Sequence, residues 1–92
     1  MQIQHESSET KGAFFIEKDG KRVAEMTYSK AGSSRIIIDH TEASEEVRGQ
    51  GLAKKLVIHG VEYARKNGLK VLPLCPYAKS VIQRNEELQD VL

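Results

Sequence analysis

The sequence is poor in several residue types, and each shortage excludes a class of protein. Its single cysteine, Cys75, excludes a disulfide within the chain, and without clustered cysteines or histidines we expect no metal site. No apolar run approaches the roughly 20 residues that cross a membrane, so no membrane partner is expected. Tryptophan is absent, and no basic run alternates with aromatic residues. Lys and Arg total 14 against 13 Asp and Glu, a balance that predicts no nucleic-acid partner. Residues 1–5 lack the basic and apolar leader of an exported protein, which predicts a cytoplasmic one.

The hydrophobic pattern predicts a single domain with one core over residues 1–92. The predicted domain contains both helices and strands (α/β in the broad sense), and its mostly antiparallel strands place it in the α+β class. Alternating or β-branched runs predict strands over residues 1–5, 13–17, 22–29, 35–41 and 69–75. Apolar residues three and four apart predict one long helix from Gly51 to about Lys66, and a short final helix follows over 77–88.

Two connections predict how these strands pair. Asp19-Gly20 is typical of a tight hairpin, so the second and third strands should be antiparallel. The long helix is a crossover connection, so the fifth strand should run parallel to the fourth and Pro76 should end it. The isoleucines at 36–38 predict that the fourth strand is covered on both faces.

The most informative segment is the turn Arg48-Gly49-Gln50-Gly51-Leu52-Ala53, which leads into the long helix. Its glycines let the backbone approach a ligand, and the first amides of a helix point outward at the positive end of its dipole. Each favourable contact with that dipole contributes roughly 0.3 to 1 kcal/mol, so a diphosphate touching several amides gains useful affinity. The turn therefore predicts a phosphate site, although a glycine turn that merely begins a helix has the same pattern.

The turn fits neither of two common phosphate motifs. A P-loop needs Lys followed by Ser or Thr, but Lys54 and Lys55 are followed by Leu56. A dinucleotide fingerprint needs Gly or Ala at position 54 and an acidic residue about 20 positions later, where Val71 and Leu72 stand. The pattern that remains is Arg-x-x-Gly-x-Ala, in which x is any residue.

That pattern resembles the coenzyme A signature of the GNAT superfamily of N-acetyltransferases, which Arg48, Gly51 and Ala53 match. From about Ile36 to Ile82 the chain is similar to a small single-domain, N-acetyltransferase-like branch of that superfamily. The resemblance implies a minimal GNAT-like fold, a mostly antiparallel sheet of about five strands in which the parallel fourth and fifth strands splay apart. It also implies acetyl-CoA as cosubstrate, bound by Thr41, Glu42, Ala43, Arg48, Gly49, Gln50, Gly51, Leu52, Ala53 and Lys54.

Two departures from the family pattern bear on catalysis. Where many members carry Asn, Ala and a proton-donating Tyr, this chain has Cys75, Ala78 and Ile82, and isoleucine cannot donate a proton. The helices that usually follow the first strand and the two strands that usually close the fold are missing, so the acceptor should meet an open surface.

The Cys75 thiol offers another route, because a thiol beside a thioester can accept the acetyl group. It needs a base or a nearby positive charge, and we expect His40, at the corresponding end of the neighbouring strand. A cysteine that only fills space and a histidine bonded to a backbone carbonyl explain the same residues.

The sequence thus predicts a domain that binds acetyl-CoA and transfers its acetyl group to an amine acceptor that it does not identify. Glu42 or Glu46 can deprotonate the amine, and Tyr28 or Tyr77 can replace the missing acid. A noncatalytic acyl-CoA sensor or carrier, or an adaptor that only contacts proteins, is the alternative. An exposed sheet edge permits a monomer or a homodimer.

Overall fold

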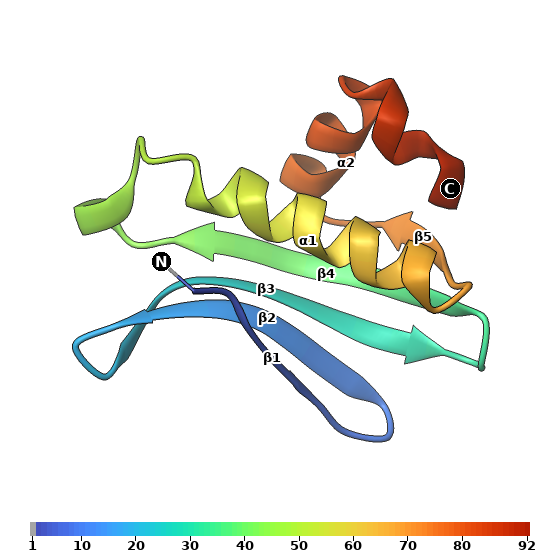
Figure 1. The fold of residues 1–92 in the computed structure, drawn as a ribbon, viewed down its shortest axis with the longest axis horizontal. Coiled ribbons are helices and arrows are strands. Elements are labelled where there is room, and N and C mark those ends of the chain that lie inside the picture. The colour runs from blue at the N-terminus through green and yellow to red at the C-terminus, as the bar shows by residue number, and fades with distance from the viewer. Residues whose placement is uncertain (1) are drawn as a thin grey trace.

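A computed structural model describes residues 2–92, so Met1, where the first strand was predicted to begin, lies outside the described residues. One sheet has the strand order β1-β2-β3-β4-β5, which confirms the predicted α+β class (Figure 1). The strands are β1 (Gln4–Ser7), β2 (Lys11–Lys18), β3 (Lys21–Ala31), β4 (Arg35–Ala43) and β5 (Lys70–Pro73). The helical elements are η1 (Glu45–Val47), α1 (Leu52–Lys66), α2 (Pro76–Gln83) and η2 (Glu86–Val91).

The strands pair as the sequence predicts. β2 and β3 form an antiparallel hairpin whose turn residues, Asp19 and Gly20, have φ angles of 53° and 80°. Two positive φ angles in succession match the twist of the strands that they join. β4 and β5 are parallel, with Ile36 opposite Val71, because α1 carries the chain back across the sheet.

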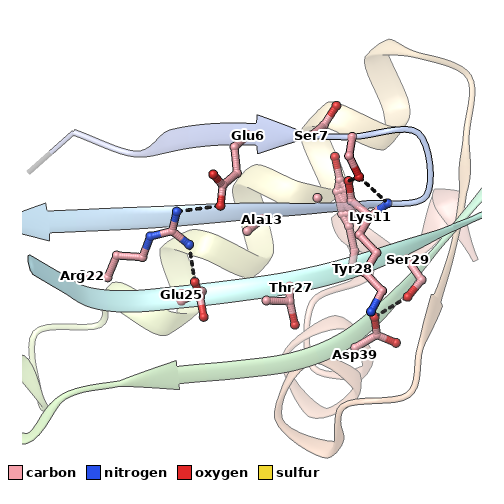
Figure 2. Close-up of a pocket in the computed structure, with 12 residues that line it drawn as sticks. Glu6, Ser7, Lys11, Ala13, Arg22, Glu25, Thr27, Tyr28, Ser29 and Asp39 are labelled. Carbon is pink, nitrogen blue, oxygen red and sulfur yellow. Dashed lines mark hydrogen bonds and ion pairs between the residues drawn. The ribbon is translucent and has the colours of Figure 1, made fainter.

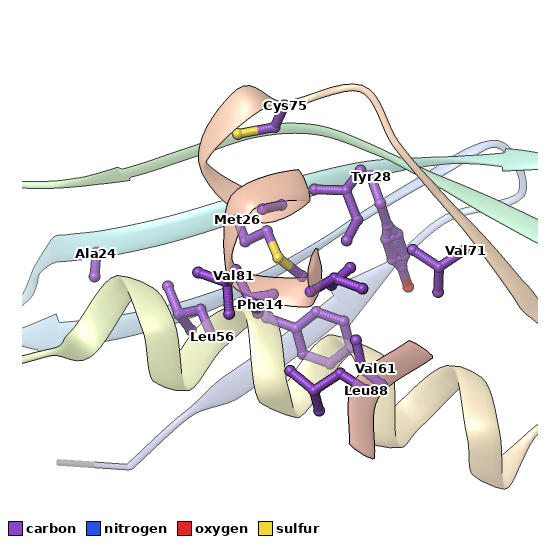
Figure 3. Close-up of a cluster of buried hydrophobic side chains, with 14 of the residues drawn as sticks. Phe14, Ala24, Met26, Tyr28, Leu56, Val61, Val71, Cys75, Val81 and Leu88 are labelled. Carbon is purple, nitrogen blue, oxygen red and sulfur yellow. The ribbon is translucent and has the colours of Figure 1, made fainter. Parts of the chain in front are cut away.

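The core lies between the sheet and the helices, which all pack on one side of it (Figure 3). From α1 the residues Leu52, Leu56, Val57, Gly60, Val61 and Ala64 are buried. Gly60 permits the close approach to the sheet, because a Cβ there would collide with the Met26 side chain. On β4, Ile36 and Ile38 are buried but Ile37 is only half-buried. The prediction of cover on both faces of this strand is therefore wrong, because the helices cover one face alone.

A β-bulge interrupts β4 at Asp39. Thr27 of β3 lies opposite His40, but the next residue, Tyr28, lies opposite Ile38, which leaves Asp39 without a partner of its own. Side chains directly opposite each other share a face of the sheet. His40 therefore shares the helix-free face with Thr27, whereas the following residue, Thr41, lies opposite the fully buried Met26 on the helix side.

The C-terminal third differs from the sequence prediction in two places. β5 ends at Pro73, and Pro76 begins α2 instead of ending the strand, because the fixed φ of proline suits the first turn of a helix. The predicted final helix is in fact α2 followed by the separate 3-10 helix η2. Arg65 of α1 holds η2 in place, donating hydrogen bonds to the Asp90 carboxylate (2.6 and 2.8 Å) and to the Glu87 carbonyl (2.6 Å).

The outer edge of β5 is short of hydrogen-bond donors. The amides of Lys70 and Leu74 donate toward β4, to Ser34 and Ile38, so the amides at 71 and 73 point the other way. Residue 73 is a proline and has no amide, which disfavours pairing with another strand at this edge. Among residues 2–92, no helix is long and apolar enough to cross a membrane.

Candidate functional site

The glycine turn between η1 and α1 has open space beside its backbone. Gly49 and Gly51 have φ angles of 90° and 72°, and a Cβ at either position would meet nothing within 4 Å. Gly51 is the N-cap of α1, so no side chain caps the first amides of that helix. Within α1, all of which is described, the first turn has no acidic residue, and Lys54 and Lys55 are exposed there. The turn can therefore attract an anion.

A cavity of about 620 Å³ opens beside this turn. It is lined by Thr41, Glu42, Ala43, Val47, Arg48, Gly49, Gly51, Leu52, Ala53 and Tyr77. Eight of the ten residues predicted for coenzyme binding are in that set, and the other two, Gln50 and Lys54, are exposed residues of the same segment.

Two lining residues, Val47 and Tyr77, are not among those predicted to bind the coenzyme. Val47 follows two glutamates and is only 1% exposed. An apolar residue in an otherwise acidic connection is a sequence signal for a buried position. The sequence predicts Tyr77 only as a replacement acid, because its place beside the cavity depends on Pro76 starting a helix.

Cys75 is held next to two residues of this cavity, Thr41 and Tyr77. It is the N-cap of α2 and only 5% exposed, and its Sγ atom donates to Oγ1 of Thr41 at 3.5 Å. Figure 3 shows it beside β4, at the margin of the buried cluster. Burial raises the pKa of the thiol, but the Ala78 amide, the Thr41 hydroxyl and the amides of Tyr77 and Thr41 lower it by more. The net pKa therefore lies below its ordinary value.

The structure does not bring His40 to this thiol as the strand pairing predicted. His40 Nε2 lies 3.2 Å from the Glu42 carboxylate, and both side chains are more than 60% exposed. The bulge at Asp39 is the physical reason, because it places His40 on the helix-free face and Thr41, instead, beside Cys75. Across residues 2–92, no group of three or more His, Cys, Asp or Glu side chains could hold a metal ion.

A second cavity, of about 730 Å³, lies on the helix-free face of the sheet (Figure 2). Arg22 spans one end of it, donating to Glu6 at 2.6 Å and to Glu25, with its Cζ 3.7 Å from the centre of the Phe15 ring. At the other end Ser29 donates to Asp39 at 2.6 Å. Arg22 bonds to both glutamates while it covers the Phe15 ring, which gives this group of side chains a structural role.

An aromatic cluster anchors β1 to the core. The His5 ring stacks on Phe14 at 4.1 Å, and its Nε2 lies 2.6 Å from the Tyr28 hydroxyl. Burial lowers the pKa of His5, and the nearby His59 and Lys30 lower it further. Burial and the neighbouring Tyr63 raise the pKa of Tyr28 well above its ordinary value. Tyr28 does not line the cavity beside the glycine turn, so of the two candidate acids only Tyr77 is placed there.

Comparison with known proteins agrees with this geometry. The model of the GCN5-related N-acetyl-transferase family matches residues 13–91. A GCN5-like protein from Staphylococcus aureus is 38% identical, with a TM-score of 0.74, and the match covers 98% of this chain and 85% of that one. A search among curated proteins finds no match.

More distant structures share the fold alone. The ribosomal-protein-alanine N-acetyltransferase of Brucella melitensis biovar Abortus 2308 is 18% identical with a TM-score of 0.68, over 84% of this chain and 62% of that one. The ribosomal-protein-S18-alanine N-acetyltransferase of Escherichia coli is 16% identical with the same TM-score, over 85% of this chain and 53% of that one. Family model, close relative and shared fold lead to one conclusion: the chain belongs to the GCN5-related N-acetyltransferase family.

Proposed function

We propose that this chain binds acetyl-CoA in the cavity beside the glycine turn and transfers the acetyl group to an amine through Cys75. Membership of the family implies acyl-CoA-dependent acetyl transfer as the class of reaction. The observation that carries the proposal is that three features lie at one cavity: the first turn of α1, the end of β4 and the Cys75 thiol. The first two line it, and the buried thiol contacts one of its lining residues, Thr41.

The coenzyme fits this cavity by the chemistry of its parts. Its diphosphate would accept hydrogen bonds from the amides of Gly49 and of Gly51 to Lys54, where the helix dipole and Arg48 favour negative charge. The amide of Gln50, within the same turn, already donates to the Val47 carbonyl. Its pantetheine arm would lie along the backbone of Thr41 to Ala43, in the manner of an added strand. The parallel pairing of β4 ends before those residues, at Ile38 opposite Pro73, which leaves room for such a strand.

Acetyl-CoA supplies an activated acetyl group as a thioester. The Cys75 thiolate would attack its carbonyl carbon, forming a new carbon–sulfur bond while the bond to the coenzyme sulfur breaks. The departing sulfur takes up the proton that Cys75 lost. A neutral amine then attacks the acetylated cysteine, the nitrogen–carbon bond forms, and Cys75 leaves again as a thiolate. The surplus proton on nitrogen passes to solvent.

Two alternatives follow from the same residues. In direct transfer the amine attacks the coenzyme thioester itself, with exposed Glu42 and its partner His40 as base. Glu46 is less suited, since it already lies 4.0 Å from Lys21. In a noncatalytic sensor or carrier the coenzyme binds without transfer. Ile82 favours that function, because this residue, only 1% exposed, replaces the usual proton donor.

Mass spectrometry of the protein after incubation with acetyl-CoA, with and without a mixture of amines, tests the proposal. We expect an acetyl adduct on Cys75 without amines and an acetylated amine when they are present. An acetylated amine with Cys75 unmodified throughout would support direct transfer. Saturable binding with neither product would support a sensor, and absence of binding would reject the coenzyme site.

A further inference from the structure

The contact between Cys75 and Thr41 joins two residues that are 34 positions apart in the sequence. Thr41 belongs to β4 and Cys75 caps α2, so the contact spans the point where β4 and β5 separate. Without the bulge at Asp39, the alternation of the strand would place the Thr41 side chain on the helix-free face. The bulge therefore places the Thr41 hydroxyl against the thiol of the single cysteine in the sequence.

We propose that Thr41 is a positioning residue whose side-chain hydroxyl holds the Cys75 sulfur beside the coenzyme cavity and donates a hydrogen bond to it when it is a thiolate. This inference rests on the proposed function for its role in catalysis, but the contact itself exists in the free protein. In the neutral thiol the S–H group donates to Oγ1, as the 3.5 Å contact indicates. When the proton leaves, the hydroxyl turns and becomes the donor.

The surroundings of the sulfur are consistent with this role. Burial opposes the charged form of Cys75, and backbone amides of Ala78, Tyr77 and Thr41 favour it together with the Thr41 hydroxyl. Among these groups the hydroxyl is the one supplied by a side chain, so it is the one that substitution can remove. The ionisable neighbours on the two elements, His40 and Glu42 of β4 and Lys79 of α2, have exposed side chains, and Tyr77 is 41% exposed.

Two variants separate the hydroxyl from the shape of the side chain. Thr41→Val keeps the branched shape and removes the hydroxyl, whereas Thr41→Ser keeps the hydroxyl and removes a methyl group. The ¹³Cβ chemical shift of Cys75, followed against pH in the free protein, reports ionisation of this thiol directly because the chain has one cysteine.

We expect the titration midpoint to rise by about one pH unit in Thr41→Val, which is roughly tenfold less thiolate at neutral pH. In Thr41→Ser it should stay near that of the unaltered protein. An unchanged midpoint in Thr41→Val, or equal rises in both variants, would overturn the inference. Should Thr41→Val fail to fold, as its amide spectrum would show, Thr41→Ala takes its place with the same expectation.

The test is independent of the proposed function, because no coenzyme is present during the titration. If the midpoint moves as expected but acetyl-CoA does not bind the unaltered protein, Thr41 still positions the thiol and only its catalytic purpose is lost. If acetyl-CoA binds and the midpoint does not move, the proposed function stands without this role for Thr41.

Discussion

The amide of Cys75 donates a 3.1 Å hydrogen bond to the carbonyl oxygen of Ile38, which also accepts one from the amide of Leu74. Regular pairing of β4 with β5 ends at this carbonyl, and the bulge at Asp39 follows immediately. One point in the fold thus sets where β5 ends, which way Thr41 faces and where the thiol lies. Substitutions here should alter reactivity, whereas substitutions in the glycine turn should alter coenzyme binding.

Gly51→Ala should weaken the binding of acetyl-CoA by at least about tenfold, because its Cβ would project toward the space that the diphosphate must enter. Gly68→Ala is the matched control. Gly68 follows the other end of α1, has a φ of 68° and also has nothing within 4 Å. Each alanine in this conformation should cost about 1 to 2 kcal/mol of stability.

Calorimetric titration with acetyl-CoA and denaturant unfolding of both variants measure the two effects separately. Equal affinities in Gly51→Ala and Gly68→Ala would show that the amides of the turn do not hold the diphosphate. Similar losses of stability would confirm that the pair is matched.

Cys75→Ala should leave acetyl-CoA bound and reduce transfer by about 100-fold or more, because it removes the thiol that we propose carries the acetyl group. The buried position predicts a modest stability loss of about 1 kcal/mol. Product formation is followed with saturating amine. A variant that transfers at the original rate would establish direct attack on the coenzyme thioester.

Gly12→Ala should destabilise the fold by about 1 to 3 kcal/mol, because the added methyl would overlap the end of the Tyr28 ring. That ring is held in place by its hydrogen bond with His5. In a double-mutant cycle with Tyr28→Leu, we expect the two losses to be less than additive. Strict additivity in urea unfolding would mean that the ring is not the obstacle.

Acid should weaken the anchoring of β1. Since the pKa of His5 in the folded protein is below its ordinary value of 6.5, the unfolded chain binds more protons between the two values. The stability that His5 contributes is therefore complete above pH 6.5 and is lost as the pH falls toward the lowered pKa. His5→Gln removes this dependence.

Urea unfolding of the unaltered protein and His5→Gln, between about pH 7.5 and pH 5, measures the effect. The advantage of the unaltered protein should shrink as the pH falls. An advantage that stays constant across this range would contradict a lowered pKa for His5 in the folded protein.

Features that depend on local backbone chemistry could be predicted from the sequence. Asp19-Gly20 adopts the positive φ angles of a tight hairpin turn, and Gly49 and Gly51 of the glycine turn also have positive φ angles, just before α1. The parallel pairing of β4 with β5 followed from the crossover helix. In the two turns a few neighbouring residues restrict the backbone strongly enough to determine the result, and the parallel pairing follows from the direction in which a crossover helix returns the chain.

Features that depend on register could not be predicted. No glycine or proline marks the bulge at Asp39, yet it reverses which face every later residue of β4 occupies. His40 was consequently expected beside Cys75, and Thr41 was considered only for its backbone. The half-exposed position of Ile37 likewise depends on the helices packing on one side of the sheet, which the strand's own composition does not reveal.

An amide NMR titration of the ¹⁵N-labelled protein with acetyl-CoA tests most directly the proposal that the glycine turn holds this coenzyme. We predict saturable shifts concentrated at residues 41–43 and 49–54, with little change at Ser29 and Asp39 on the helix-free face, and a much weaker response to AMP. No response at millimolar acetyl-CoA, or shifts centred on the helix-free cavity, would contradict it.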